Sequence, residues 1–416
     1  MKSLRRMLDK QGRHFDKGGK LEKLRPLYDT IENFLFTSGE VAAGPVFIRD
    51  SLDYKRMMIT VFFALFPVVV MAMYNTGLQA NLVLTAAGKN AAAGWRGGLL
   101  SFLGCGINPG SIAADMIHGA LYFLPVYFVS FAVGAFWEVL FGILRKHEAS
   151  EGFLVTSLLF PLILPPTLPL WQAAVGISFG IVIGKEVFGG VGMNIVNPAL
   201  VSRIFLFFAY PGQITGDAVW TAVDGLSRAT PLAHITEKGI DALNSIPGTF
   251  QGVDLEPAAI TLKDAFLGFI PGSMGETSAL ACLLGAVILI AAGIGSWRIM
   301  VSVAVGMVSL SLLLNLIGSS TNPMFAVPFY WHFVLGGFAF GTVFMATDPV
   351  TAAFTDKGKY LYGLLIGFLV VLVRVMNPAF PEGMMLAIVF GNVFSPIIDR
   401  IFVNANIKRR ALRNVQ

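Results

Sequence analysis

The stretch DGLSRATP (224–231) places two hydroxyl side chains, Ser227 and Thr230, beside the charges of Asp224 and Arg228. It stands out because 55% of the chain is hydrophobic and only 13% of its residues are charged. A hydroxyl ahead of a proline commonly accepts a hydrogen bond from the local backbone. These residue types by themselves therefore favour a turn and a helix cap at Thr230 over a reactive site.

Glu138 lies within the apolar run VGAFWEVLFGILRKH (133–147). A carboxylate inside a membrane helix is costly unless it is paired or faces water, so it counts as a functional candidate by default. The small residues Gly134 and Ala135 permit another group to approach closely. The structural alternative is that Glu138 pairs with Arg145, two helical turns further along.

Two asparagines follow a glycine-rich segment in GKEVFGGVGMNIVNPAL (184–200). The glycines predict a flexible turn between membrane helices. Asn197 stands before Pro198, an arrangement typical of a helix start. Asn194 and Asn197 are therefore either structural or part of a polar site at this turn.

Two aspartates, Asp348 in MATDPV and Asp399 in FSPIIDR, present carboxylate oxygens, the ligand type that hard cations prefer. Asp348 could equally be a helix cap. Asp399 could instead pair with Arg400 or Lys408 near the membrane surface.

Metal chemistry is not expected from the remaining polar residues. The five histidines are scattered without ligand spacing, and Cys105 and Cys282 are isolated. Neither a metal site nor an iron–sulfur centre held by this chain alone is predicted.

Long apolar runs must position these groups, and they predict an integral membrane protein. Frequent Gly and Pro within long runs favour packed helices over a closed barrel. The net charge of +5 is concentrated near the chain ends, so we expect no nucleic-acid partner. The N-terminus lacks the apolar core of a signal peptide, so we expect no cleavage there. The fold class expected is an all-α polytopic membrane protein.

Ten apolar segments define the expected helices. They span residues 57–75, 115–144, 153–164, 168–184, 197–210, 277–295, 298–317, 333–346, 360–376 and 383–403. The expected domains are an N-terminal arm (1–56), a first membrane repeat (57–210), a loop region (211–276), a second repeat (277–403) and a basic tail (404–416).

The two halves resemble each other. The short segments 153–164 and 333–346 adjoin polar or proline-rich breaks, and an NPA tripeptide follows at Asn197 and again at Asn377. Five segments per half is an odd number, so we expect two inverted five-helix repeats with broken half-helices. Such half-helices hold polar groups or ions near the membrane midplane.

Basic residues set the expected orientation. Both termini are predicted to be cytoplasmic, together with residues 145–152, Lys185, Arg203 and 355–359. The loop 211–276 is more acidic than basic, so we expect it on the opposite, periplasmic side.

Longer stretches carry a resemblance to a known family. They are RDSLDYKRMMI (49–59), residues 136–174, GKEVFGG (184–190), FLFFAYPGQITGD (205–217), FMATDPV (344–350) and NPAFPEGMMLAI (377–388). Together with DGLSRAT, they resemble the family of B-type subunits of Na⁺-translocating NADH:quinone oxidoreductases and their Rnf relatives. The resemblance covers nearly the whole chain.

This resemblance implies that the loop is a flavinylation motif. In that family the last Thr forms a phosphoester with FMN, installed from FAD by a flavin transferase outside the membrane. Asp224, Ser227, Ala229 and Thr230 match the motif, whereas Arg228 stands where Gly is usual. Thr230 is therefore the expected attachment point of a covalent FMN.

The resemblance also implies the remaining sites. Asn194 and Asn197 match positions near a non-covalent riboflavin. Gly134, Ala135, Phe136 and Glu138 match a region linked to quinone binding, where Ala135 stands in place of a frequent Gly. Asp348 and Asp399 match acidic positions implicated in Na⁺ handling.

The expected function is that of a redox subunit in the inner membrane of a bacterium. It passes electrons from a partner flavin subunit through FMN and riboflavin to ubiquinone, coupled to Na⁺ export. Expected partners are the A, C, D, E and F type subunits, membrane lipid and the transferase. NADH is not expected to bind here, because no strand-framed GxGxxG is present.

Two other functions stay open. A D-type subunit of an Rnf complex would share the flavinylated loop but exchange electrons with ferredoxin and NAD partners. A solute channel or transporter on the same inverted repeat would carry no flavin.

Overall fold

The computed structural model describes residues 54–89, 91–145, 152–377 and 381–414, and a few scattered positions before residue 54. Six helices in these ranges are long and apolar enough to cross a membrane. They are α3 (Tyr54–Ala86), α5 (Ile112–Arg145), α7 (Leu170–Gly184), α13 (Trp297–Ile317), α16 (Asp356–Met376) and α17 (Met384–Asn414). The prediction of an all-α polytopic membrane protein is confirmed.

Shorter apolar helices account for the other predicted segments. Three are continuous: α6 (Gly152–Leu162), α8 (Pro198–Ala209) and α12 (Ala279–Ala291). The predicted segment 333–346 is instead divided into α14 (Phe329–Val334), α15 (Phe338–Phe340) and the π-helical turn η5 (Gly341–Met345). All ten predicted segments thus coincide with helical elements.

The polar C-terminal half of α3 extends the helix eleven residues past the predicted boundary at residue 75. Its amides find partners inside the bundle, so the polar sequence does not end the helix. Asn75 donates to the carbonyl oxygen of Ile270 at 2.9 Å, and Asn81 donates to Asp115 of α5 at 2.7 Å.

Contacts between helices follow a similar order in the two halves. In the first half α5 packs against α7, and α7 against α8. In the second half α13 packs against α16, and α16 against α17. In addition, α3 packs against α12 between the halves. The five-helix repeat and its inverted orientation stay predictions.

Glycines allow the helix backbones to approach each other at the α13 and α16 crossing. A Cβ atom on Gly363 would lie 1.9 Å from the Ser302 hydroxyl, and one on Gly367 would lie 2.1 Å from the Val303 carbonyl oxygen. Small residues favour such close packing in membranes, because dispersion contacts replace the hydrophobic driving force.

Both helix breaks have their carbonyl groups satisfied by protein. After α6, the carbonyls of Leu162 and Leu164 accept hydrogen bonds from Gly275 N at 2.7 Å and Met274 N at 3.1 Å. Irregular backbone at membrane depth is tolerated only with such partners. The second break, at Gly336 and Gly337, has positive φ angles of 64° and 65°.

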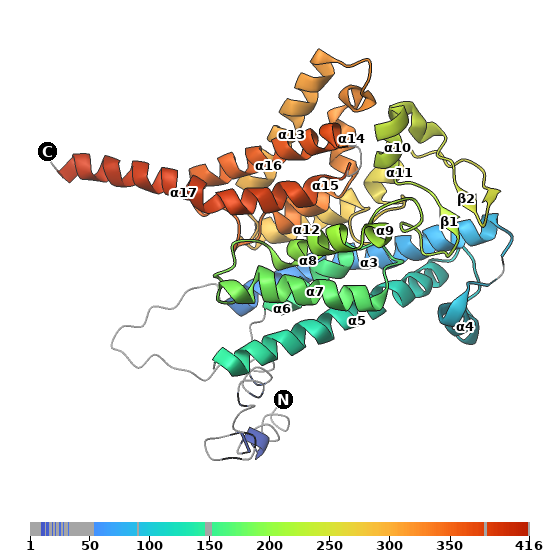
Figure 1. Ribbon diagram of the computed structural model, residues 1–416, viewed down its shortest axis with the longest axis horizontal. Helices are drawn as coiled ribbons and strands as arrows, with labels where there is room; N and C mark the ends of the chain where they lie inside the picture. The colour runs from blue at the N-terminus through green and yellow to red at the C-terminus, as the bar shows by residue number, and fades with distance from the viewer. Residues whose placement is uncertain are drawn as a thin grey trace.

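The region 211–276 folds as a compact cap at one end of the helices, and the C-terminal end of α17 lies at the other (Figure 1). It contains α9 (Pro211–Ile214), α10 (Pro231–Lys238), η3 (Ile240–Asn244) and α11 (Leu262–Leu267). A small antiparallel sheet, which was not predicted, joins β1 (Leu226–Ser227), β2 (Thr249–Phe250) and β3 (Val253–Asp254).

Apolar residues anchor this cap on the end of α3. Leu226 and Phe250 pack with Val83 and Leu84. Short elements complete the described ranges from residue 54 onward: α4 (Gly94–Phe102), η2 (Glu186–Phe188) and η4 (Pro323–Ala326). The predicted arm 1–56 lies almost wholly outside the described residues, as do Pro378 and Ala379 of the second NPA.

Candidate functional site

Thr230 lies at the start of α10 and caps it. Its hydroxyl accepts a hydrogen bond from Ala233 N at 3.3 Å, and Pro231 follows as the first helical residue. Gly225, with φ of 87°, makes the preceding turn. The structural expectation of a turn and a cap is therefore confirmed, and the side chain is 7% exposed.

Thr230 also lines a small pocket between the cap and the membrane helices. Leu232, Ile270 and Leu335 give the pocket apolar walls, and Gly272, Gly336 and Gly337 leave backbone at its surface. Its polar side chains are Thr230, Ser273, Glu276, Thr277 and Glu382. A threonine hydroxyl thus opens onto a mixed polar and apolar pocket, which we name the Thr230 pocket.

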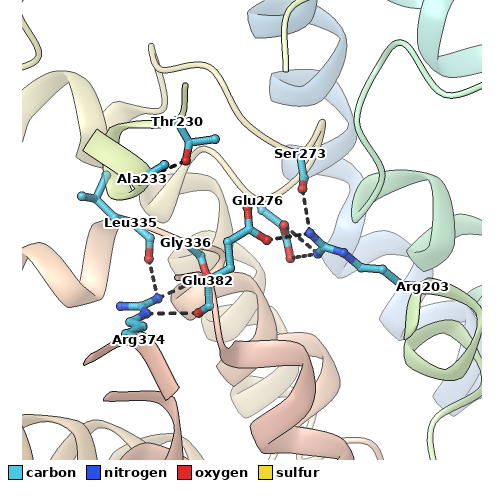
Figure 2. A network of polar contacts seen from close by, with 9 residues as sticks. All are labelled: Arg203, Thr230, Ala233, Ser273, Glu276, Leu335, Gly336, Arg374 and Glu382. Carbon is cyan, nitrogen blue, oxygen red and sulfur yellow. Dashed lines mark hydrogen bonds and ion pairs between the residues drawn. The ribbon is translucent and has the colours of Figure 1, made fainter. Parts of the chain in front are cut away.

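Beneath the Thr230 pocket lies a buried network of two arginines and two glutamates (Figure 2). Arg203 of α8 binds both carboxylate oxygens of Glu276 at 2.9 and 3.0 Å, and Glu382 at 2.7 Å. The same guanidinium donates to the Ser273 hydroxyl at 3.2 Å. These charge-assisted hydrogen bonds to two carboxylates offset the cost of burying the Arg203 charge.

Arg374 of α16 approaches Glu382 from the other side (Figure 2). It is 0% exposed, and its Nε donates to the Glu382 carbonyl oxygen at 3.1 Å. Its terminal nitrogens donate to the carbonyls of Leu335 at 2.8 Å and Gly336 at 3.2 Å. Arg374 therefore satisfies the second helix break, as backbone N–H groups satisfy the first.

The sequence analysis missed this network: it assigned Arg203, within the expected helix 197–210, to the cytoplasmic side. Arg203 is buried within α8, and its partners Glu276 and Glu382 come from segments assigned to the opposite side. A usable signal was present, because an arginine within an apolar helix requires a buried partner.

The other motif residues surround Thr230 on the cap. Asp224 and Ser227 are exposed, and Ala229 is half-buried. Arg228 donates from its backbone N to the Asp217 carbonyl oxygen at 2.8 Å, and its side chain lies against Gly248. The predicted motif thus runs from a turn at Asp224 and Gly225 through β1 to the cap residue Thr230.

A second pocket lies between the two halves of the membrane domain and brings together residues assigned separately. Asn197 caps α8, as predicted, through bonds to its side-chain oxygen from Ala199 N and Leu200 N. Its amide nitrogen also donates to Asp348 at 3.0 Å. Further lining residues are Met58, Thr156, Lys185, Asn194, Phe344 and Thr347. We name it the inter-repeat pocket.

Asp348 has a cap-like geometry in that pocket. It accepts hydrogen bonds from Val350 N at 3.0 Å and the Thr351 hydroxyl at 3.1 Å, besides the Asn197 amide. A structural role is therefore present, and the same carboxylate faces a pocket with polar walls.

Glu138 does not form the expected pair with Arg145. Its carboxylate accepts a hydrogen bond from the buried ammonium of Lys185, which follows α7. Arg145 instead pairs with Glu186 at 3.0 Å. Lys185 extends from the neighbouring helix at the level of Glu138, whereas Arg145 lies at the end of α5, where Glu186 is available.

The predicted quinone residues divide between two faces of α5. Gly134 and Glu138 are buried toward α7, and a Cβ on Gly134 would lie 3.2 Å from Ile181. Phe136 is 59% exposed, because a separation of two residues turns it to the opposite side of the helix. Ala135 is half-buried.

Asp399 binds neither Arg400 nor Lys408, so those predicted partners are wrong. Its carboxylate accepts from the backbone N of Phe354 and Thr355 at 2.7 and 2.9 Å, and from the Thr355 hydroxyl at 2.5 Å. It therefore fixes the loop that leads into α16. Among the described residues, no group of three or more His, Cys, Asp or Glu could hold a metal ion.

Comparison with known proteins finds relatives that match nearly the whole sequence. Residues 41–408 match the model of the NQR2, RnfD, RnfE family. The chain is 56% identical to the B-type subunit of the Na(+)-translocating NADH-quinone reductase of Ectopseudomonas mendocina, over 99% of this chain and 100% of that protein. The proteins of the same name from Stutzerimonas stutzeri and Yersinia pestis are 55% and 54% identical, over at least 99% of each chain.

Proposed function

The chain belongs to the NQR2, RnfD, RnfE family, and from this membership we propose that it is the B-type subunit of a Na⁺-translocating NADH-quinone reductase. It is then a multi-pass subunit of an oxidoreductase complex, and the six candidate spans support its place in a membrane. The proposed membrane is the inner membrane of a bacterium, with both termini cytoplasmic.

The observation that carries the proposal is the placement of Thr230. Thr230 lines the Thr230 pocket, and its hydroxyl stands at the N-terminus of α10, the positive end of the helix dipole. An FMN phosphate esterified to this oxygen would lie at that end, and the glycines of the pocket leave room beside backbone. The residues present therefore fit a covalent FMN on Thr230, with Asp224, Ser227 and Ala229 in the recognition turn.

The inter-repeat pocket is the proposed riboflavin site. Its amides, ammonium, hydroxyls and carboxylate offer both donors and acceptors to the polar edge of a flavin ring, and Met58 and Phe344 supply apolar walls. Asn194 and Asn197 are the residues expected to contact the ring. A flavin bound there supplies the electron-transfer chemistry, and the protein positions it and adjusts its potential.

The proposed quinone region adjoins this pocket through Lys185. Its ammonium binds Glu138 and also lines the inter-repeat pocket. Gly134, Ala135 and Glu138 are the proposed contacts, and Phe136 would be reached only from the exposed side of α5. Ubiquinone is the proposed acceptor.

For Na⁺ we propose Asp348 as an oxygen ligand, because its carboxylate lines a polar pocket at a helix break. Asp399 has three donors from the 354–355 loop and fits a structural role better. The proposed partners are the A, C, D, E and F type subunits, membrane lipid and a flavin transferase.

The test is to replace Thr230 and look for covalent flavin. We expect Thr230→Ala to abolish in-gel flavin fluorescence after denaturation while the chain still inserts, because the attachment oxygen is absent. Thr230→Ser keeps a hydroxyl and is expected to retain part of the signal. A fluorescent Thr230→Ala band would refute Thr230 as the attachment point.

The absorbance spectrum of the purified wild-type chain separates this function from the transporter alternative, which predicts no flavin. A bound quinone separates it from the Rnf alternative, whose electron partners are ferredoxin and NAD.

A further inference from the structure

Two basic side chains close to Thr230 in the sequence have buried nitrogen atoms without hydrogen-bond partners. His234 is 7% exposed, and neither of its ring nitrogens has a partner. The Nε of Arg228, on the other side of Thr230, is likewise buried and unpaired. Buried polar groups are nearly always hydrogen-bonded, so two such groups within four residues of Thr230 in the sequence require a physical explanation.

The backbone places both residues around the start of α10. His234 follows Thr230 by four residues, so the two lie on the same face of the helix. Arg228 precedes Thr230 by two residues and interacts electrostatically with His234. The start of α10 adds the positive end of the helix dipole, although Pro231 has no N–H and Ala233 N already donates to the Thr230 hydroxyl.

Burial disfavours the charged forms of both basic groups, and the largest charge effects on His234 come from two acids, Asp217 and Glu237. Burial lowers the pKa of His234, and burial also lowers the pKa of Arg228. The charged groups that act on His234 besides Arg228 are Asp217, Glu237 and Lys238, all of which are exposed. Solvent screens those charges, so the cluster lacks a buried counter-charge.

We propose that Arg228, His234 and the first turn of α10 bind the phosphate group that links the flavin to Thr230. This proposal rests on the proposed function, and it adds two residues and a ligand chemistry, a phosphate diester anion, to that site. A diester attached to the Thr230 oxygen carries one negative charge beside two basic groups and a helix N-terminus. The arginine at position 228 then contributes a guanidinium where a glycine could contribute none.

The experiment compares full-length chain produced with and without flavin transferase. Histidine is isotopically labelled, and His234→Gln assigns the His234 ring signals. In the wild-type chain we expect the pKa of the His234 ring to rise on flavinylation, because the phosphate stabilises the imidazolium. An unchanged His234 titration in flavinylated chain would overturn the proposal.

Thermal unfolding supplies a second measurement. We expect flavinylation to raise the Tm of the wild-type chain, and we expect His234→Gln, Arg228→Gln and their combination to lose most of that gain. Arg228→Lys keeps the charge and should retain part of it. Asp241→Asn in η3 is the matched control, because Asp241 is exposed and is not among the charges that act on His234, and it should keep the full gain.

The outcomes separate the two proposals. Absence of covalent flavin from the wild-type chain would refute the proposed function. Covalent flavin with an equal gain in Tm in all variants would refute only the phosphate-binding role of Arg228 and His234. If a variant fails to accept flavin, the His234 titration of the wild-type chain still decides the question.

Discussion

Lys185 illustrates, at the scale of one residue, how a buried charge depends on its neighbours. Its ammonium is 4% exposed and lies between the carboxylates of Glu138 and Glu186, and Glu186 also binds Arg145. Two acids and two bases thus neutralise one another. Burying such a group of charges costs free energy, and removing one member costs more, because it leaves a buried charge without its partner.

We therefore expect Lys185→Met to destabilise the chain by about 3 to 5 kcal/mol, because it leaves Glu138 buried without its ammonium. Thermal unfolding in detergent measures the loss. The double variant Lys185→Met with Glu138→Leu removes both charges and should recover most of the stability. If the double variant is no more stable than Lys185→Met, the unpaired Glu138 carboxylate is not the cause of the lost stability.

His234 gives a prediction about pH for the chain without flavin. Burial lowers its pKa in the folded state, so the folded ring is neutral where the unfolded ring, with an ordinary pKa of about 6.5, takes up a proton. Stability from this residue is full above the unfolded pKa and is lost as the pH falls below it. We expect Tm to decrease more steeply below about pH 6.5 in wild-type chain than in His234→Gln. Parallel curves for the two chains would contradict this.

At the scale of helices, close packing at the α13 and α16 crossing depends on glycines, which have no side chain. A Cβ on Gly367 would meet the backbone carbonyl of Val303, which cannot move without moving α13. We expect Gly367→Ala to cost about 1 to 3 kcal/mol through overpacking. Gly98→Ala in α4 is the control, since nothing lies within 4 Å of a Cβ there. Equal Tm values for the two variants would contradict this prediction, because they would show that α13 and α16 can move apart without loss of stability.

The positions of the helices could be predicted from the sequence because apolar length determines where a chain can cross a membrane. Boundaries were wrong where polar residues are paired inside the protein, as at Asn75 and Asn81 of α3. The break at 335–337 was not anticipated, because it lies inside the expected segment 333–346, and the expected break followed that segment at 344–354. Its stabilisation by Arg374 was also missed, because the partners come from two segments, 332–336 and Glu382, that are separate from α16.

The same limit applied to the site. Thr230 and its cap follow from local sequence, and the structure has the expected cap. The partners of Glu138 and Asp399 were wrong, because residues of the same helix were considered first. Their actual partners, Lys185 and Thr355, lie 47 and 44 positions away. The spacing of residues along one helix cannot reveal a contact with a residue of a neighbouring segment.

At the scale of the whole molecule, the cap and the C-terminal end of α17 lie at opposite ends of the helices (Figure 1). This separation gives a prediction about topology. A single cysteine at Asn244, which is exposed in the cap, should react with an impermeant maleimide in intact spheroplasts. Cys105 and Cys282 are removed first.

The matched control is a cysteine at Asn404, exposed on the part of α17 beyond the predicted membrane boundary. It should react only after lysis. Labelling of Asn404→Cys in intact cells, with Asn244→Cys protected, would reverse the assigned orientation.

Arg374 has a consequence for the biosynthesis of the chain. Its partners lie on both sides of it in the sequence, at residues 332–336 and at Glu382. A ribosome that has just completed α16 has not yet delivered Glu382 to the membrane, and an unpaired arginine opposes insertion by up to about 3 kcal/mol. Helices α16 and α17 should therefore leave the insertion machinery together, after α14 is already in place. The final fold of this half thus imposes an order on its own synthesis.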